Sequence, residues 1–170
     1  DPESFVSRKD GKKSYNLLHI NATYDLLQHL YLDAILQKFR NTDECGALTT
    51  MVDRSDIPKA LVLADRNYES YNNLAHVSEK GQYFVFRCKD VNSNGILLGS
   101  KHKLPKTMEF DCTISLILTR KWTKEVLEHP EKYRRFRNKD SFDFADLDEN
   151  PFYYMDLRVL KFPISEMYSD

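Results

Sequence analysis

Residues 59–88 read KALVLADRNYESYNNLAHVSEKGQYFVFRC, and this stretch decides the fold. Its first six residues are almost continuously aliphatic and stop at Asp65, which is typical of a central strand covered on both faces. Residues 69–79 carry apolar side chains at helical spacing, and Gly81 follows as a C-terminal glycine. Residues 82–88 are rich in aromatic and β-branched side chains. Strand, helix and strand at this spacing predict a βαβ crossover with parallel strands.

Two further strands are predicted upstream of this unit. Residues 14–24, SYNLLHINATY, and residues 30–37, LYLDAILQ, are rich in Leu, Ile and Tyr. Residues 25–29 form the turn between them. Because the two segments lie close in sequence, we expect them to pair as an antiparallel hairpin.

The remaining part of the first half is predicted as one helix and one loop. Residues 43–52 have apolar side chains at helical spacing, and either Asp43 or Thr42 can cap this helix. Residues 1–13 are polar, and we expect a loop or a frayed end there.

The second half of the chain, residues 91–165, is predicted to be β-rich. Residues 110–119 and 152–162 are expected to form long strands, and residues 122–129 a helix. Long polar connections with turn residues separate these elements. The predicted fold class is therefore α/β, with a β-rich unit after the βαβ crossover.

Length and composition fit a folded protein of one domain, or of one domain with an insertion. The chain has 170 residues, of which 41% are hydrophobic and 30% charged. It has no apolar run of about 18 residues, so we expect no membrane span. It begins without Met, and we expect it to be a piece of a longer protein. Three distant cysteines without a CxxC pair favour reduced thiols over a zinc site or a disulfide framework.

Charge is distributed unevenly along the chain, although the net charge is −1. Residues 101–139 contain eleven Lys or Arg and five Asp or Glu, whereas residues 140–170 contain two and eight. A basic segment of this kind is compatible with a surface that faces phosphates. It is equally compatible with a solvated basic face beside an acidic one.

Asp65 is the candidate for metal chemistry. In open α/β sheets, ligands bind at the carboxyl ends of the strands, and a carboxylate placed there is a suitable ligand for Mg²⁺. Two such ions can activate the attacking oxygen of a phosphodiester reaction and stabilise the leaving oxygen. An Asp after a strand is also a common turn or cap residue, so the position alone does not decide between these roles.

Residues 61–90 resemble the second-aspartate region of DDE transposases of the bacterial "insertion sequence four" group. That region combines an aliphatic strand, Asp-Arg-Gly-Tyr, a helix, a glycine, and a strand that ends in Arg. The segments LLHINATYDLL, VDRS, SNGIL, SLILTRKWTKEV and FYYMDLRVLKFPIS are similar to the same group. The resemblance covers nearly the whole chain. One departure is Asn67 in place of the usual Gly, which a turn can accept because Asn tolerates positive φ.

The resemblance implies a ribonuclease-H-like mixed sheet, here partial, with a β-rich insertion. Residues 1–90 would belong to the catalytic core, residues 91–165 to the insertion between the second Asp and the Glu, and residues 166–170 to a tail. Family members bind Mg²⁺ or Mn²⁺ through Asp, Asp and Glu, and they cut DNA at transposon ends and join it elsewhere. Asp65 would be the catalytic, metal-binding residue of this chain.

The resemblance also implies that two catalytic acids lie outside the chain. The first Asp normally belongs to an Asp-Gly-Ser strand before residue 1, and the Glu to a Tyr-x2-Arg-x3-Glu-x6-Lys helix. That spacing does not occur in this sequence, since Tyr133, for example, is followed at the Arg position by Phe136. We therefore expect the isolated chain to be catalytically inert and to bind metal weakly.

Several other residues are candidates for DNA contacts, because Arg matches phosphate oxygens and aromatic rings stack on bases. Each also has a structural interpretation: ion pairing for the arginines, and a core position for the tryptophan. His19 on the first strand could face the site, but a structural, hydrogen-bonded role is more common. The DNA-contact candidates are Arg66, Arg87, Arg120, Lys121, Trp122, Arg134, Arg135 and Arg137.

The sequence therefore predicts a transposase fragment that acts, within its parent protein, on double-stranded transposon-end and target DNA. We expect a cytoplasmic, nucleoid-associated bacterial protein without a membrane partner, and the full-length protein could pair as a homodimer. Two alternatives remain open. The chain could be a nucleic-acid-binding or interaction protein that keeps the fold without the acids, or a different Mg²⁺-dependent phosphohydrolase.

Overall fold

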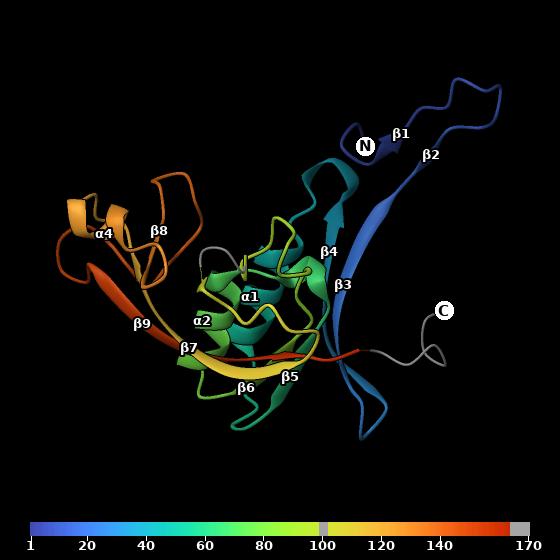
Figure 1. Cartoon of the computed structure of the whole chain (residues 1–170). Coiled ribbons are helices and arrows are strands. Elements are labelled where there is room, and N and C mark those ends of the chain that lie inside the picture. Colours follow the sequence, from blue (N-terminus) through green and yellow to red (C-terminus); the bar gives the residue numbers. More distant parts are fainter. Residues whose placement is uncertain (99–101, 164–170) are drawn as a thin grey trace. The chain divides into compact units, whose positions relative to one another are not determined.

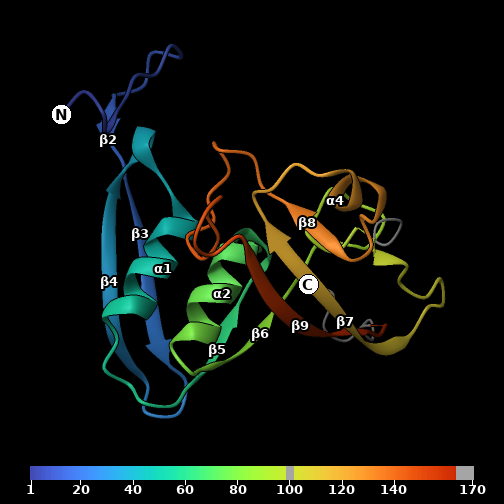
Figure 2. The same ribbon diagram turned by 90° about the vertical axis from the view of Figure 1, so that its left-hand side faces the viewer.

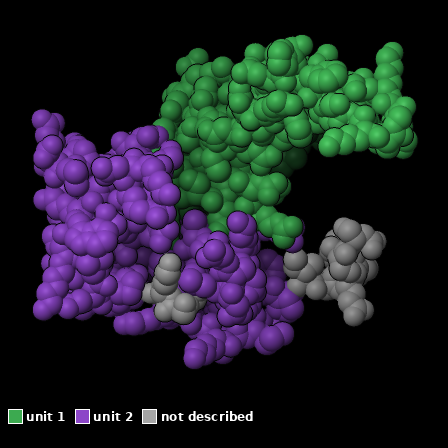
Figure 3. All heavy atoms as spheres, turned by 90° about the horizontal axis from the view of Figure 1, so that it is seen from above, with its two compact units in different colours: residues 1–86 green, residues 87–170 purple. Residues whose placement is uncertain are grey.

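The computed structural model describes residues 1–98 and 102–163, so the predicted tail lies outside the described part. The chain forms two compact units, residues 1–86 and 87–170, which Figure 3 colours separately. Each unit is a mixture of strands and short helices (Figures 1 and 2). Within the described residues, no helix is long and apolar enough to cross a membrane.

The predicted antiparallel hairpin is present in the first unit. Strand β3 (Leu18–Asp25) pairs with β4 (Leu30–Lys38), and Ala22 lies opposite Ala34. The carboxylate of Asp25 accepts hydrogen bonds from the amides of Leu27 and Gln28, which closes the turn between the strands. This side chain thus explains why the strand ends at Asp25.

The N-terminal segment, residues 1–13, was predicted as a loop or a frayed end, and this prediction was wrong for Phe5–Val6, which form a strand. Strand β1 (Phe5–Val6) pairs antiparallel with β2 (Tyr15–Asn16), and Ser4 is buried. Lys38 holds the segment, because its ammonium forms ion pairs with the carboxylates of Asp1 and Glu3. After η1 (Phe39–Asn41), the chain enters the first long helix.

The βαβ crossover is confirmed. Strand β5 (Leu61–Ala64) and strand β6 (Tyr83–Phe86) pair in parallel, and helix α2 (Tyr71–Glu79) connects them. Ser70 caps α2 through its hydroxyl, and Gly81 adopts φ +71°, the left-handed conformation that glycine accepts at a helix C-terminus. The helical spacing of apolar side chains is confirmed, because Tyr71, Leu74, Ala75 and Val77 are all buried.

Helix α1 (Glu44–Arg54) packs against α2 and against the hairpin. Of the two predicted cap residues, Asp43 and Thr42, the structure selects Asp43, whose carboxylate accepts a hydrogen bond from the amide of Gly46. Leu48, Val52 of α1 and Val77 of α2 form the centre of the core, with Val62, Tyr68, Phe84 and Phe86 packed around them.

The prediction that the strand at residues 59–64 is covered on both faces was wrong. In β5, Leu61 is 58% exposed and Leu63 53% exposed, whereas Val62 packs against the core. The physical reason is that β5 and β6 form a sheet of only two strands, with helices on one face. The hairpin β3–β4 is likewise a separate two-stranded sheet, so the expected single mixed sheet is not formed by the described residues.

The second unit is built on a three-stranded sheet of order β8-β7-β9. Strand β7 (Phe110–Thr119) pairs antiparallel with β9 (Phe152–Lys161), which confirms both predicted long strands. Strand β8 (Tyr133–Arg135) pairs in parallel with β7 and was not predicted as a strand. Helix α4 (Lys124–Glu128) begins after Thr123, whose hydroxyl accepts a hydrogen bond from the amide of Val126.

Candidate metal-binding turn and nucleic-acid surface

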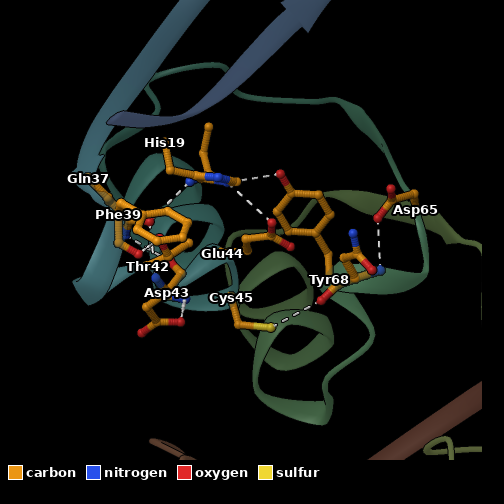
Figure 4. A network of polar contacts seen from close by, with 12 residues as sticks. His19, Gln37, Phe39, Thr42, Asp43, Glu44, Cys45, Asp65 and Tyr68 are labelled. Carbon is orange, nitrogen blue, oxygen red and sulfur yellow. Dashed lines mark hydrogen bonds and ion pairs between the residues drawn. The ribbon is translucent and has the colours of Figure 1, made fainter. Parts of the chain in front are cut away.

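Asp65 lies directly after β5, at the start of the 3₁₀ turn η2 (Arg66–Tyr68). Its backbone is extended, and its carboxylate Oδ1 accepts a hydrogen bond of 2.8 Å from the amide of Asn67 (Figure 4). The side chain is exposed, so the second carboxylate oxygen can receive a ligand from solvent. Asp65 therefore caps the turn and presents a carboxylate oxygen at the carboxyl end of the strand.

Asn67 does not have the positive φ that the resemblance to Asp-Arg-Gly-Tyr suggested for this position. Within the described residues, the only non-glycine residues with positive φ are His29 and Lys103. Asn67 instead lies inside a right-handed 3₁₀ turn, in which any ordinary residue is accommodated. The replacement of Gly by Asn at this position consequently places no strain on the backbone.

Asp65 has the chemistry of a ligand for a hard divalent ion, because carboxylate oxygens are what Mg²⁺ and Mn²⁺ bind. One carboxylate is not a complete site. No group of three or more His, Cys, Asp or Glu side chains that could hold a metal occurs in the described parts of the chain. Asp65 therefore fits one ligand of a metal site.

Tyr68 anchors the end of the turn. Its hydroxyl donates a hydrogen bond of 3.0 Å to the side-chain oxygen of Asn21 in β3, and its carbonyl accepts one of 2.8 Å from the side chain of Asn73 in α2. Burial raises the pKa of the Tyr68 phenol, and the nearby carboxylates of Glu44 and Asp65 raise it further. The phenol is thus kept protonated, as a hydrogen-bond donor, at neutral pH.

Two groups beside the turn have structural partners. The Nε2 atom of His19 lies 3.2 Å from a carboxylate oxygen of Glu44, so this histidine has a partner at the first turn of α1 (Figure 4). The thiol of Cys45 donates to the carbonyl of Asn67 at 3.6 Å, and burial raises the pKa of this thiol. No disulfide joins Cys45, Cys88 or Cys112 in the part of the chain that the structure describes.

In the second unit, the tryptophan is on the surface rather than in the core. Trp122 is 66% exposed, and the guanidinium of Arg135 lies 3.9 Å from the centroid of its ring. The ammonium of Lys121 lies 5.6 Å from the centroid of the Phe152 ring. Exposed aromatic rings paired with cations provide both stacking surface and positive charge, which are the two features that single-stranded nucleic acid binds.

Arg120 differs from the other basic residues of this segment, because backbone groups occupy its guanidinium. Its nitrogens donate hydrogen bonds of 2.7–3.1 Å to the carbonyls of Arg137, Asp140, Phe142 and Ala145. The side chain thereby holds the connection between β8 and β9. These bonds use four of the five N–H donors of the guanidinium, so one N–H of Nη1 remains for a phosphate or another partner.

The remaining candidates for phosphate contacts are placed differently. Arg66 and Arg87 are exposed, and Arg87 directly follows Phe86, the β6 residue paired with Ala64. Arg134 is a half-buried residue of β8. The side chain of Arg137 is exposed and lies 3.5 Å from the carboxylate of Asp140.

A family model described as "Transposase DDE domain" matches residues 3–154 of the chain. This chain belongs to the transposase DDE domain family. A search of curated proteins found no match, and a search of solved structures found none either. Membership makes the chain a transposase-derived protein, from a family that acts on DNA and uses divalent metal ions.

Within this transposase domain, sequence reasoning did not identify the groups that hold the turn. Asn21 and Asn73 are buried, and both contact Tyr68. One signal was available for Asn21: an Asn in the middle of an apolar strand is unfavourable unless its amide is hydrogen-bonded. The two partners of that amide, Tyr68 and Gln37, are 47 and 16 residues away in sequence, and no local pattern reveals them.

Proposed function

We propose that this chain is an internal part of the catalytic domain of an "insertion sequence four" transposase, and that Asp65 is its second catalytic aspartate. The observation that carries the proposal is the place of Asp65. It follows the first strand of a parallel βαβ unit, one carboxylate oxygen is held by the amide of Asn67, and the side chain is exposed. A metal ligand needs this combination of fixed direction and access.

In the complete protein, Asp65 binds Mg²⁺ or Mn²⁺ together with an aspartate and a glutamate from outside this chain. The bound metal supplies the polarisation and the activated oxygen for phosphodiester cleavage and joining. The exposed apolar face of Leu61, Leu63, Tyr83 and Val85 supports a larger, ribonuclease-H-like core in the parent, because a folded protein rarely leaves such a face uncovered. The isolated chain is inert.

The second unit is the insertion of this domain, and it binds DNA. Trp122 stacks on a base, while Arg135, Arg134, Arg137 and Lys121 contact phosphates. Arg66 and Arg87 add contacts beside the catalytic turn. Because these contacts release counterions, affinity falls as salt concentration rises. The parent transposase acts on double-stranded transposon ends and target DNA, and it could do so as a homodimer.

A second function is favoured by the surface of the second unit. The exposed ring of Trp122, with the half-buried Arg135 beside it, can bind nucleic acid without any catalytic acid. A parent that lacks the other two acids would therefore be a nucleic-acid-binding protein that retains the fold. If Asp65→Asn leaves DNA binding by the chain unchanged, the result fits both functions. Metal binding at Asp65 fits only the transposase function.

The test is Mn²⁺ binding to the ¹⁵N-labelled chain, followed by paramagnetic broadening of backbone amide signals. We expect Mn²⁺ to broaden the amides of Asp65 and Asn67 first. Asp65→Asn should abolish this broadening while keeping the turn, since an Asn side chain can accept the same hydrogen bond. The matched control is Asp56→Asn, which removes another exposed carboxylate of the same unit.

Broadening that survives in Asp65→Asn would contradict the proposal. The inertness of the isolated chain is checked with the same variants in a DNA-nicking assay with Mn²⁺. We expect no difference between the wild-type chain and Asp65→Asn. Asp65-dependent nicking would show that the chain already contains a complete site.

A further inference from the structure

A chain of side-chain hydrogen bonds, part-buried at Asn21, runs from the Asp65 turn into the hairpin. Asn21 in β3 is only 1% exposed, and its side chain has partners on both sides. The oxygen accepts the bond of 3.0 Å from the Tyr68 hydroxyl, and the nitrogen donates one of 3.2 Å to the side-chain oxygen of Gln37 in β4. Both polar ends of this buried amide are therefore used.

The chain continues from Gln37 to the start of helix α1. The side-chain oxygen of Gln37 accepts a bond of 3.1 Å from the amide of Asp43, and its nitrogen donates one of 2.9 Å to the carbonyl of the same residue. Asp43 is the cap of α1. Side-chain hydrogen bonds thus join the η2 turn, both strands of the hairpin and the first turn of α1. Figure 4 shows part of this network.

We propose that Tyr68 and Asn21 are positioning residues, which hold the η2 turn in register with β3 and thereby set the direction of the Asp65 carboxylate. This inference rests on the proposed function of Asp65 as a metal ligand. Neither residue touches the metal in this proposal. Each acts through the backbone of the turn.

The geometry makes Tyr68 the point where the turn is fixed. The side chain of Asp65 has one hydrogen bond, to an amide inside its own turn, so that bond does not orient the turn relative to the rest of the unit. Tyr68 attaches the turn to other elements at two points, its hydroxyl on β3 and its carbonyl on α2, and the Cys45 thiol of α1 adds a longer contact of 3.6 Å to the Asn67 carbonyl. A metal ligand works only if the groups behind it keep its direction constant.

The role of the pair is tested with Tyr68→Phe, which deletes only the hydroxyl. The matched control is Tyr83→Phe, which removes the hydroxyl of a tyrosine that is 61% exposed on β6. The first measurement is hydrogen exchange of the Asn67 amide, and it needs no metal. We expect the Asn67 amide to exchange about three- to tenfold faster in Tyr68→Phe, which is the factor that corresponds to the free energy of one hydrogen bond. The exchange rate should remain unchanged in the control.

The second measurement is the Mn²⁺ affinity at Asp65, which should fall by about the same factor for the same reason. A double variant, Tyr68→Phe with Asn21→Leu, separates positioning from stability. Replacing both partners by apolar groups removes the unsatisfied buried oxygen, so resistance to urea should recover. The Asn67 exchange rate and the Mn²⁺ affinity should not recover, because the attachment is still missing.

Unchanged Asn67 exchange in Tyr68→Phe would overturn the inference, and so would a double variant whose Mn²⁺ affinity recovers together with its stability. Failure of the proposed function gives a different result. In that case the wild-type chain shows no Asp65-dependent Mn²⁺ binding. The exchange rates then still decide whether Tyr68 and Asn21 position the turn.

Discussion

The guanidinium of Arg135 lies over the ring of Trp122, 3.9 Å from its centroid, on the surface of the second unit. This pair joins strand β8 to the segment before α4, and it leaves the ring 66% exposed. A stacked guanidinium fixes the orientation of the ring while its outer face stays open. The pair is thus a ready stacking surface for a base.

Trp122→Ala should weaken the binding of a short single-stranded oligonucleotide by about fivefold or more, the lower range for loss of one base-stacking ring. Fluorescence anisotropy of a labelled oligonucleotide measures this. Trp122 is the only tryptophan, so quenching of its emission reports the contact directly in the wild-type chain. Tyr154→Ala, which removes an exposed ring from β9, is the control. Equal affinities of both variants would exclude Trp122 from the binding surface.

Arg120→Lys should destabilise the second unit by about 2–4 kcal/mol, because a lysine cannot bond four carbonyls arranged around a planar guanidinium. Urea unfolding measures the loss. Lys121→Ala, at the neighbouring position, should cost less than about 1 kcal/mol, since its ammonium makes only a surface cation–π contact. A stable Arg120→Lys variant with weakened DNA binding would instead assign Arg120 to the DNA surface.

Asn67→Gly, which restores the residue typical of the related transposases, should destabilise the chain by about 0.5–1 kcal/mol. The backbone there is right-handed, so glycine gains nothing in the folded state and has more freedom in the unfolded state. Asn67→Ala should be nearly neutral in the same urea titrations. A chain stabilised by glycine would mean that φ at this position is positive.

The ion pair of Asp33 and Arg54 should make stability depend on acid pH. The Arg54 guanidinium, 2.6 Å from the carboxylate, holds the pKa of Asp33 below its ordinary value of 3.8. The folded chain therefore binds this proton less readily than the unfolded chain. The resulting stabilisation is present above pH 3.8 and is lost as the pH falls through the lowered folded-state pKa.

The measurement is urea unfolding of Asp33→Asn and of the wild-type chain at several pH values. The difference in unfolding free energy should be constant near neutral pH and should shrink below pH 3.8. Asp56→Asn is the control, because the described structure gives Asp56 no ion pair. A difference for Asp33→Asn that stays constant down to the lowest pH would show that the pair does not stabilise the fold.

The elements around Asp65 were predictable from sequence because local chemistry determines them. An aliphatic run, a helix with buried Leu74 and Val77, and Gly81 at its end define the βαβ unit without further information. The hairpin was predictable in the same way, from two apolar segments and the short turn of residues 25–29 between them. In each case the elements follow one another directly in sequence, so local patterns and short connections determine their pairing.

The features that the sequence analysis missed share a cause: each of them depends on partners that are distant in sequence. The strand β1 has two residues, and the pairing with β2 and the ion pairs of Lys38 are what order it. The strand β8 was interpreted only as a basic run, because its pairing with β7 is invisible locally. The four acceptors of Arg120 are backbone carbonyls, which no sequence pattern marks.

The central claim is that Asp65 is a catalytic metal ligand, and the most direct measurement is Mg²⁺-dependent cleavage of transposon-end DNA by the complete parent transposase. Loss of one metal-binding carboxylate should reduce the cleavage rate of the Asp65→Asn variant by about 10³-fold or more, while Asp56→Asn cleaves at the wild-type rate. Cleavage by Asp65→Asn within about threefold of wild type would contradict the claim, since a change of that size amounts to less than 1 kcal/mol of the barrier.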